Sequence, residues 1–317
     1  MVVRISCSLT PLVVFYFYVV FQGVIMSKIT LSGPVVSADW LAQNLHHDEL
    51  VIFDASLAAP GAPAITAIGG EFIGNAVFFD INEICDKGSD LPHMMPDAEQ
   101  FTSQMQQLGV NQNSTVVVYD DKGIYSSARV WWMFLAMGFD RVAVLDGGLP
   151  GWLKAEHPVN LIQQIDSQET DNHSSDIAVG DFVAHPQEGY FCDHETVFSG
   201  LSNQQFNVLD ARSPGRFSGV EADPRPHTRS GHMPGAINMH YAWLFEDHGL
   251  LKSKEEIAQL FFKLSPTKDS LIFSCGSGVT ACILALSATL VGITDVIVYD
   301  GSWSEWGRPG ELPVVYE

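Results

Sequence analysis

The amino-acid sequence predicts an α/β protein in which one domain occurs twice, each copy being a parallel sheet flanked by helices. Two observations predict this fold: a long internal repeat, and an alternation of short β-branched runs with longer segments of helical period inside each repeat. A chain of 317 residues is long enough for two domains of ordinary size, each with its own core.

The repeat pairs residues 116–152 with residues 271–306. Upstream, residues 51–55 match residues 208–212, and the distance along the chain from these segments to the repeat agrees within one position. Two unrelated α/β units that share only a strand pattern would not be expected to keep this register. We therefore interpret the chain as the product of a duplication.

Within each copy, β-branched runs predict strands and longer amphipathic or apolar runs predict helices. Each strand ends at a polar or glycine-rich turn, as expected for a parallel sheet whose ligands bind at the carboxyl ends of its strands. The expected strands cover residues 115–119, 142–145, 271–273 and 296–299, and the expected helices cover residues 126–137 and 279–291.

At one position of the repeat the first copy has Asp120 and the second has Cys275. Cys275 follows an expected strand, and the helix expected to begin near Val279 points its free amides and the positive end of its dipole at the thiol. The second copy is therefore expected to be the active one.

The copies predict a domain over residues 27–155, a linker over residues 156–190 and a second domain over residues 191–317. The linker contains the polar run QQIDSQETDNHSSD, whose charges fit a solvated spacer better than a binding tail. Residues 1–26 hold a short apolar run that allows a signal peptide or membrane anchor. Because Met26 opens an ordinary start, a misassigned start codon is the interpretation that we favour.

Composition limits the partners. The chain has 16 Lys and Arg against 37 Asp and Glu, a formal net charge of −21, which argues against nucleic acid or an anionic membrane surface. The five cysteines form no C-x-x-C pair and no spacing typical of a zinc site, so we expect no metal and reduced thiols in a cytoplasmic protein, with membrane attachment or export left open by the apolar N-terminal run. Cys282 lies in an apolar helical segment and is interpreted as a core residue.

The loop Cys275-Gly276-Ser277-Gly278-Val279-Thr280 is the strongest candidate site. Its two glycines let several backbone amides point inward, and such a nest of amides stabilises a thiolate or a persulfide. Ser277 and Thr280 add hydroxyl donors. The alternative is a buried structural cysteine at a tight turn, but the bracketing glycines and a nearby group of arginines favour a nucleophile.

The CGSGVT loop, the paired domains and Asp120 in place of a first-copy cysteine resemble the two-domain rhodanese superfamily, from about Val35 to the end of the chain. The resemblance is greatest to the members that use 3-mercaptopyruvate. It implies two tandem rhodanese-like domains, a catalytically silent first copy, catalysis by Cys275 and Ser277, and no cofactor. Gly276, Gly278, Val279 and Thr280 are then expected to bind substrate through the loop.

The same resemblance implies that Arg216 and Arg225 bind the carboxylate and keto oxygen of the substrate, which suits guanidinium geometry. The alternative is that both are surface residues paired with Glu221 and Asp223. His93, in the segment LPHMMP, matches a histidine that reaches the cleft between the domains. Asn82 stands where the family often has an acidic residue, which places a Ser277-His93-carboxylate relay in doubt.

The expected reaction moves sulfur from 3-mercaptopyruvate through a Cys275 persulfide to an acceptor thiol such as reduced thioredoxin, or to cyanide, and releases pyruvate. Thiosulfate is the alternative donor, although thiosulfate enzymes carry basic residues after the cysteine where this chain has Gly276 and Ser277. A second alternative is a non-catalytic interaction protein of rhodanese fold. A Cys-loop phosphatase would need C-x5-R, and position 281 is alanine; G-x-S-x-G of a serine hydrolase is also absent from the loop.

Overall fold

The computed structural model describes residues 29–58, 62, 65, 70–161, 177–203, 206–266 and 270–316. The N-terminal run and the polar run of the expected linker lie outside the described residues, so their interpretations stay predictions. Among the described residues, no helix is both long and apolar enough to cross a membrane.

Each copy contains a five-stranded sheet in which every neighbouring pair is parallel. The first sheet has the order β1-β6-β5-β2-β4, and the second, read from the corresponding edge, has the order β8-β12-β11-β9-β10. The strands are, in the first sheet, β1 Val35–Val36, β6 Val142–Leu145, β5 Thr115–Tyr119, β2 Leu50–Asp54 and β4 Val77–Phe78, and in the second β8 Phe191–Cys192, β12 Val296–Tyr299, β11 Leu271–Ser274, β9 Asn207–Asp210 and β10 Ile237–Asn238.

Helices flank both sheets, and a short antiparallel pair adds β3 Glu71–Phe72 and β7 Asn160–Leu161 to the first copy. Polar side chains cap several of the helices, as when Ser37 accepts from the amide of Trp40 at the start of α1. The helices are α1 Ala38–Asn44, α2 Ala98–Gln107, α3 Ser127–Ala136, α4 Gly148–Lys154, α5 His194–Asn203, α6 Pro214–Ser218, η1 Tyr241–Leu244, α7 Lys254–Leu264, α8 Ala281–Leu290 and α9 Ser302–Trp306.

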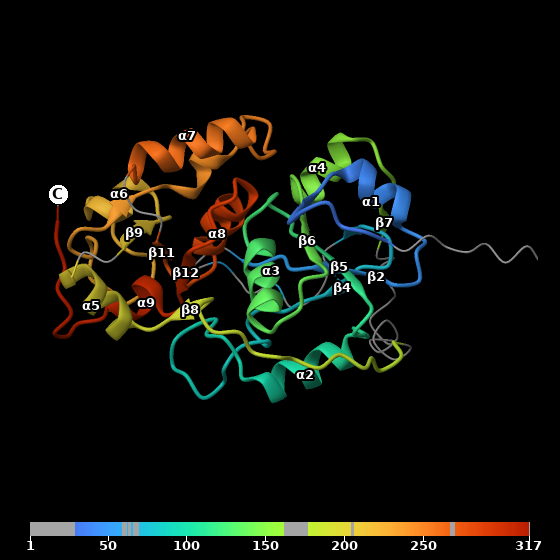
Figure 1. Ribbon diagram of the computed structural model, residues 1–317, viewed down its shortest axis with the longest axis horizontal. Coiled ribbons are helices and arrows are strands. Elements are labelled where there is room, and N and C mark those ends of the chain that lie inside the picture. Colours follow the sequence, from blue (N-terminus) through green and yellow to red (C-terminus); the bar gives the residue numbers. More distant parts are fainter. Residues whose placement is uncertain are drawn as a thin grey trace, which may run out of the picture.

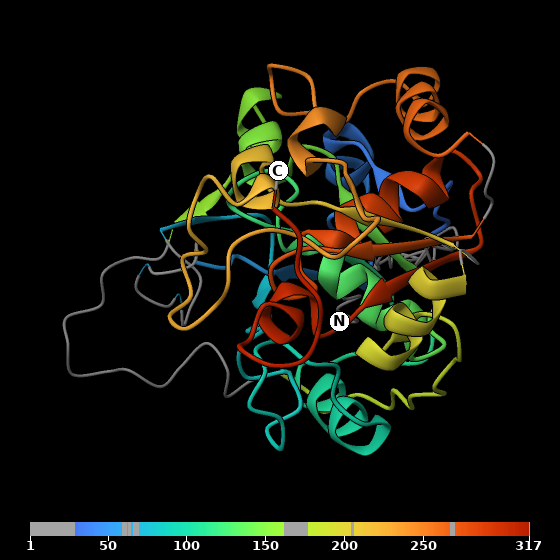
Figure 2. The ribbon, with the colours of Figure 1, turned by 90° about the vertical axis from the view of Figure 1, so that its left-hand side faces the viewer.

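The two copies lie side by side, with α3 and α8 between their sheets (Figure 1). Both helices are apolar on nearly every face, and a helix of that kind needs cover all round. They pack against each other, and a single cluster of buried apolar side chains runs from Phe53 in the first copy to Val298 in the second. Figure 2, which faces the left-hand side of Figure 1, shows elements of the second copy, such as α9, in front of the first copy.

The predicted fold class is confirmed. Three of the four expected strands have the observed bounds, and β11 is one residue longer. The helix expected to begin near Val279 begins instead at Ala281. Gly278 has a left-handed backbone (φ 72°), so the loop is still turning at this residue and helical geometry starts only after it.

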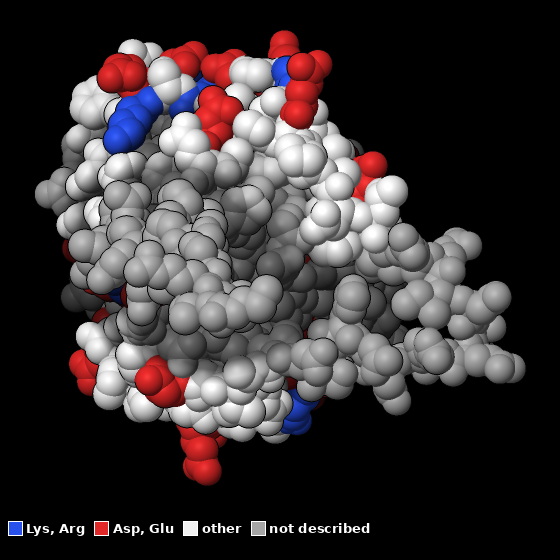
Figure 3. Space-filling view, turned by 90° about the vertical axis from the view of Figure 1, so that its right-hand side faces the viewer, with Lys and Arg blue, Asp and Glu red and all other residues white. Residues whose placement is uncertain are grey.

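Part of the expected linker packs on the first copy. Residues 177–190 form backbone hydrogen bonds to it, including Phe182 N to Val110 O at 3.1 Å and His185 N to Met137 O at 2.8 Å. Phe182 is fully buried among the aromatic side chains of the first copy. On the face in Figure 3, the described charged side chains are mostly acidic, in keeping with the net charge of −21.

Candidate active site

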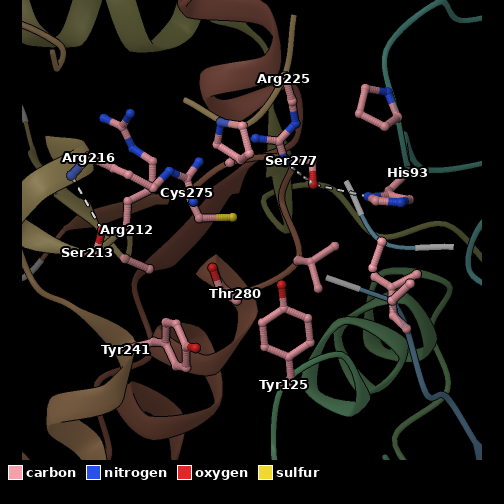
Figure 4. A pocket seen from close by; sticks show the side chains of 18 of the residues that line it. His93, Tyr125, Arg212, Ser213, Arg216, Arg225, Tyr241, Cys275, Ser277 and Thr280 are labelled. Carbon is pink, nitrogen blue, oxygen red and sulfur yellow. Dashed lines mark hydrogen bonds between the residues drawn. The ribbon is translucent and has the colours of Figure 1, made fainter. Parts of the chain in front are cut away.

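A cavity of about 550 Å³ lies between the two copies at the carboxyl end of β11. The second copy contributes the loop after β11 and the arginines, and the first copy contributes side chains from residues 57–125 (Figure 4). Eight of the nine residues that the sequence singled out line it, namely Cys275, Gly276, Ser277, Val279, Thr280, Arg216, Arg225 and His93; the ninth, Gly278, does not.

Cys275 lies in the loop between β11 and α8, where it is 1 % exposed and its sulfur points into the cavity (Figure 4). The start of α9 holds the carbonyls of this loop: Trp303 N donates to Cys275 O at 3.0 Å and Ser304 N donates to Gly276 O at 2.7 Å. The amides of residues 276–280 donate to no acceptor in the described part of the chain. The loop therefore presents a nest of free N–H groups beside the thiol, which suits an anion.

The corresponding loop of the first copy shows what such a nest binds. Asp120 occupies the position of Cys275, and its carboxylate accepts four backbone N–H groups at 2.8 to 3.0 Å and the Ser127 hydroxyl at 2.7 Å. The four amides are those of Lys122, Tyr125, Ser126 and Ser127. Because the loops are copies, the thiol of Cys275 occupies the position that this bound carboxylate occupies in the first copy.

The two glycines of the loop after β11 are required for different reasons. A Cβ on Gly276 would lie 2.8 Å from both terminal nitrogens of Arg225, so glycine lets the guanidinium approach the loop. Gly278 needs its left-handed backbone, and a Cβ there would also lie 2.8 Å from Asp300 O. Both glycines shape the site, although Gly278 itself is not exposed to the cavity.

The side chain of Ser302 holds the backbone of Cys275 in place. Its hydroxyl accepts from Cys275 N at 3.1 Å and donates to Tyr299 O at 2.7 Å, and the residue is fully buried. Ser302 has a left-handed backbone (φ 47°), whereas the first copy has Gly148 with φ 52° at the corresponding position. The second copy thus tolerates a strained serine where glycine would fit without strain, and the serine hydroxyl holds the amide of Cys275.

Arg216 and Arg225 are held by one carboxylate. Asp223, with a side chain 1 % exposed, lies 2.6 Å from Arg216 Nη2 and 3.2 Å from Arg225 Nη1. Burial acts to raise the pKa of Asp223, but the hydrogen bond and charge of Arg216, with those of Arg225, hold it below its ordinary value. The three groups carry one net positive charge. The alternative interpretation expected both arginines to pair with acidic residues at the surface. The pairing with Asp223 is present, but both arginines also line the cavity.

His93 reaches Ser277 across the boundary between the copies, with 3.1 Å between Nδ1 and Oγ. On its other side Nε2 lies 3.2 Å from Asn82 Oδ1. The orientation of the Asn82 amide follows from its Nδ2, which donates to Asp80 Oδ1 at 3.1 Å, so Oδ1 faces the imidazole and must accept. His93 therefore carries its proton on Nε2 and accepts the Ser277 hydroxyl proton at Nδ1.

The imidazole is kept uncharged. Burial, followed by the charges of Arg129 and Arg225, lowers the pKa of His93 from 6.5 to about 4. Ser277 Oγ also accepts from Arg225 Nη2 at 3.2 Å. The Ser277 hydroxyl is thus oriented by a cation on one side and a neutral acceptor on the other.

Several lining residues were missed by sequence reasoning. Tyr125, from the first-copy loop, and Tyr241 face the thiol, with their rings in an edge contact at 6.1 Å (Figure 4). Burial, then the charges of Tyr241 and Cys275, raise the pKa of Tyr125 to about 12, so it stays a hydroxyl donor. The repeat contained the signal, because Tyr125 corresponds to Thr280, and the facing arrangement of the two loops brings both residues to one cavity. Arg212, interpreted from sequence as structural, is buried and forms an ion pair with Asp210 at 2.7 Å.

Known proteins are similar to this chain along most of its length. The model of the rhodanese-like domain family matches residues 37–155 and 195–308. Human 3-mercaptopyruvate sulfurtransferase is 39 % identical over 90 % of the chain and 97 % of its own length. The Arabidopsis thaliana protein named thiosulfate/3-mercaptopyruvate sulfurtransferase 1, mitochondrial, is 37 % identical over 92 % of the chain and 80 % of its own length. The crystal structure of Escherichia coli SseA, described as a 3-mercaptopyruvate sulfotransferase, superposes with a TM-score of 0.73 and 33 % identity over 86 % of the chain and 100 % of its own.

Proposed function

Because this chain belongs to the rhodanese family and carries its domain twice, we propose that it is a sulfurtransferase that moves sulfur from 3-mercaptopyruvate through a persulfide on Cys275. One observation carries this proposal: the thiol lies beside a nest of free amides whose first-copy counterpart holds a carboxylate. Such a nest stabilises both the attacking thiolate and the persulfide that forms on it.

In the first half-reaction the Cys275 thiolate attacks the sulfur of 3-mercaptopyruvate. The new S–S bond forms as the C–S bond breaks, and the electron pair of that bond passes to the departing carbon, giving the enolate of pyruvate, which takes a proton from solvent. Arg216 and Arg225 are placed to hold the carboxylate and the keto oxygen, where negative charge develops in the enolate. The Ser277 hydroxyl, oriented by His93, adds a donor near the sulfur.

In the second half-reaction an acceptor thiol, such as reduced thioredoxin, or cyanide in an assay, removes the outer sulfur and restores Cys275. The scheme uses no metal and no organic cofactor. Cys85, Cys192, Cys275 and Cys282 are free thiols, which suits a reducing compartment such as the cytoplasm, where an acceptor thiol is kept reduced. Double-displacement kinetics are expected.

The charge of the cavity favours the keto acid over thiosulfate. The arginine pair and Asp223 sum to one positive charge, which matches a monoanionic carboxylate, whereas a dianion would gain from a further cation near the sulfur. The residues directly after Cys275 are Gly276 and Ser277 and supply none. Thiosulfate remains the second candidate donor, since the name of the Arabidopsis relative gives both donors.

The proposal divides the chain as the repeat does. Residues 191–317 form the catalytic domain, residues 27–155 form a domain without a thiol at the nest, and residues 156–190 connect them. The first domain still supplies His93 and Tyr125 to the cavity.

The proposal is tested by pyruvate release from 3-mercaptopyruvate with Cys275→Ser and, as matched control, Cys192→Ser, whose thiol lies outside the cavity. We expect the first variant to be inactive and the second to keep wild-type activity. Mass spectrometry of the wild type after donor treatment should show one added sulfur that cyanide removes. Activity in Cys275→Ser would reject the site, absence of the persulfide would favour the interaction-protein alternative, and a larger kcat/KM for thiosulfate would replace the donor.

A further inference from the structure

A buried ion pair joins the two copies next to the cavity. Arg129, in α3 of the first copy, is fully buried, and its Nη1 lies 2.7 Å from Oδ1 of Asp300, which follows β12 in the second copy. The guanidinium also lies over the ring of Phe191, 4.5 Å from the centroid. Neither residue lines the cavity, so the pair does not touch substrate.

The pair holds the backbone around His93 on both sides. Arg129 Nη2 donates to the His93 carbonyl at 2.6 Å, and Asp300 Oδ2 accepts from Met95 N at 2.8 Å. Arg129 Nη1 also approaches Gly278 O, in the catalytic loop, at 3.4 Å. One ion pair therefore contacts the segment that carries His93 and the loop that carries the nucleophile.

The His93 backbone needs such support. It has a left-handed conformation (φ 63°), which is unfavourable for a residue with a Cβ and persists only where its surroundings enforce it. This conformation aims the imidazole at Ser277 Oγ. If the carbonyl of His93 and the amide of Met95 lost their partners, the turn would relax and the imidazole would leave the hydroxyl.

The stability of the fold alone does not explain why this ion pair is present. Taking both charges out of water is costly, and apolar side chains in such places are often as stabilising. The second copy has Leu284 where the first has Arg129, and Leu284 is fully buried in the same core. An apolar side chain therefore fits at this position of the repeat. Unlike leucine, Arg129 donates hydrogen bonds to His93 O and Gly278 O.

We propose that the Arg129–Asp300 ion pair is a positioning device that locks His93 against the Ser277 hydroxyl across the boundary between the copies. It acts through His93 and makes no contact with the substrate. The inference rests on the proposed sulfurtransferase activity for its kinetic readout, and the NMR readout below does not depend on that activity.

The molecule contains a matched control. Asp146, the first-copy counterpart of Asp300, makes the reciprocal contact and accepts from Leu251 N of the second copy at 3.0 Å. This contact ties the same two copies together but has no arginine and lies away from His93. Asp146→Asn therefore perturbs a contact between the copies without touching the proposed device.

The experiment is a cycle of variants: His93→Ala, the charge-neutral pair Arg129→Met/Asp300→Asn, the triple variant, and Asp146→Asn. We expect His93→Ala and the pair variant each to lower kcat for pyruvate release, on the order of 10²-fold, with KM little changed. Because both changes remove the same interaction, the triple variant should be no slower than His93→Ala. Asp146→Asn should stay within about twofold of wild type.

Multiplied losses in the triple variant would overturn the proposal, as would a pair variant with wild-type kcat. If the pair variant does not fold, Arg129→Lys replaces it, since lysine keeps a charge for Asp300 but lacks the fork that also reaches His93 O and Gly278 O. Arg129→Lys should then lower kcat when His93 is present and have no effect on kcat in the His93→Ala variant. Equal losses of kcat in both proteins would reject the positioning role of Arg129.

Imidazole nitrogen NMR shifts supply the readout that is independent of catalysis. In the wild type His93 should show its proton on Nε2, and the Arg129 variants should lose that single tautomer as the turn relaxes. An unchanged His93 signal in those variants would contradict the positioning role even if activity fell. If the wild type releases no pyruvate, the proposed function fails, and the NMR comparison still decides the positioning role.

Discussion

The loops after β5 and β11 share a backbone plan and differ in the residue at its centre. In the first copy the carboxylate of Asp120 accepts four amides and one hydroxyl, so the nest is permanently filled. In the second copy the amides of residues 276–280 have no acceptor in the described part of the chain, and Cys275 lies beside them. The backbone makes an anion site in both copies, and one side chain decides whether it is structural or available for chemistry.

The copies also differ in the turn that follows β6 in the first copy and β12 in the second. Gly148 adopts a left-handed backbone without strain in the first copy, whereas Ser302 adopts it in the second copy and anchors Cys275 N. The filled loop is therefore relaxed, and the open loop is strained and incompletely hydrogen-bonded. That contrast is expected where function competes with stability.

Cys275→Asp gives the largest expected effect, because it converts the second loop into the first. Without a thiol, no persulfide forms and pyruvate release should fall to background. The new carboxylate should take the free amides as Asp120 does, so the melting temperature should equal or exceed that of the wild type. Calorimetry and the pyruvate assay measure both. A large loss of stability would show that the two loops are not equivalent nests.

Asp120→Ala tests the filled loop. Removing the carboxylate leaves four backbone amides, two of them buried, and a hydroxyl without their acceptor. The cost should be about 3 kcal/mol of unfolding free energy, or roughly a 150-fold change in the folding equilibrium. Urea denaturation measures it. Asp120→Asn keeps one acceptor oxygen and should lose less; equal losses for the two variants would argue that the charge-assisted bonds contribute little.

Asp223→Asn removes the negative charge between the arginines and should change the choice of donor. The cavity gains one positive charge, so the ratio of kcat/KM for thiosulfate to that for 3-mercaptopyruvate should rise about tenfold, which corresponds to ~1.4 kcal/mol. Glu221→Gln is the control, because Glu221 accepts from Ser213 and, in the described part of the chain, forms no ion pair with Arg216 or Arg225. An unchanged ratio in Asp223→Asn would remove net charge as the basis of selectivity.

Asn82→Asp gives the smallest expected effect, a shift in pH dependence. The pKa of His93 is lowered to about 4, so steps that need neutral His93 persist as the pH falls and are lost only near that value. A carboxylate next to Nε2 stabilises the protonated imidazole and raises its pKa, so the acidic limb of kcat/KM should move to higher pH. A limb that stays in place would mean that His93 does not govern it.

Much of this architecture could be predicted. The repeat and the strand patterns are local signals, and they located the sheets, α3 and the loop of Cys275 in advance; the resemblance to the rhodanese superfamily is confirmed. The start of α8 was misplaced by two residues because the turn at Gly278 is a backbone property. Asp223 was noted as a partner of the arginines, but its sharing by both depends on the fold of the turn between them.

Contacts between the two copies could not be predicted from the sequence. Arg129 and Asp300 are far apart in the chain, and nothing in either local pattern indicates that they meet. The sequence placed the relay in doubt at Asn82 because the sequence shows only that this side chain has no charge. In the structure its amide is oriented by Asp80, and an oriented neutral acceptor selects the tautomer as a carboxylate would.

The common core of α3 and α8 explains why a copy without a thiol persists. Every residue of α8 from Ala281 to Ala288 is buried, largely against the first copy and its own sheet. A chain consisting of the second copy alone would expose that apolar surface to water. Each copy thus forms part of the solvent-excluded interior of the other, so the first copy is needed to cover the second even though it has no thiol at its nest.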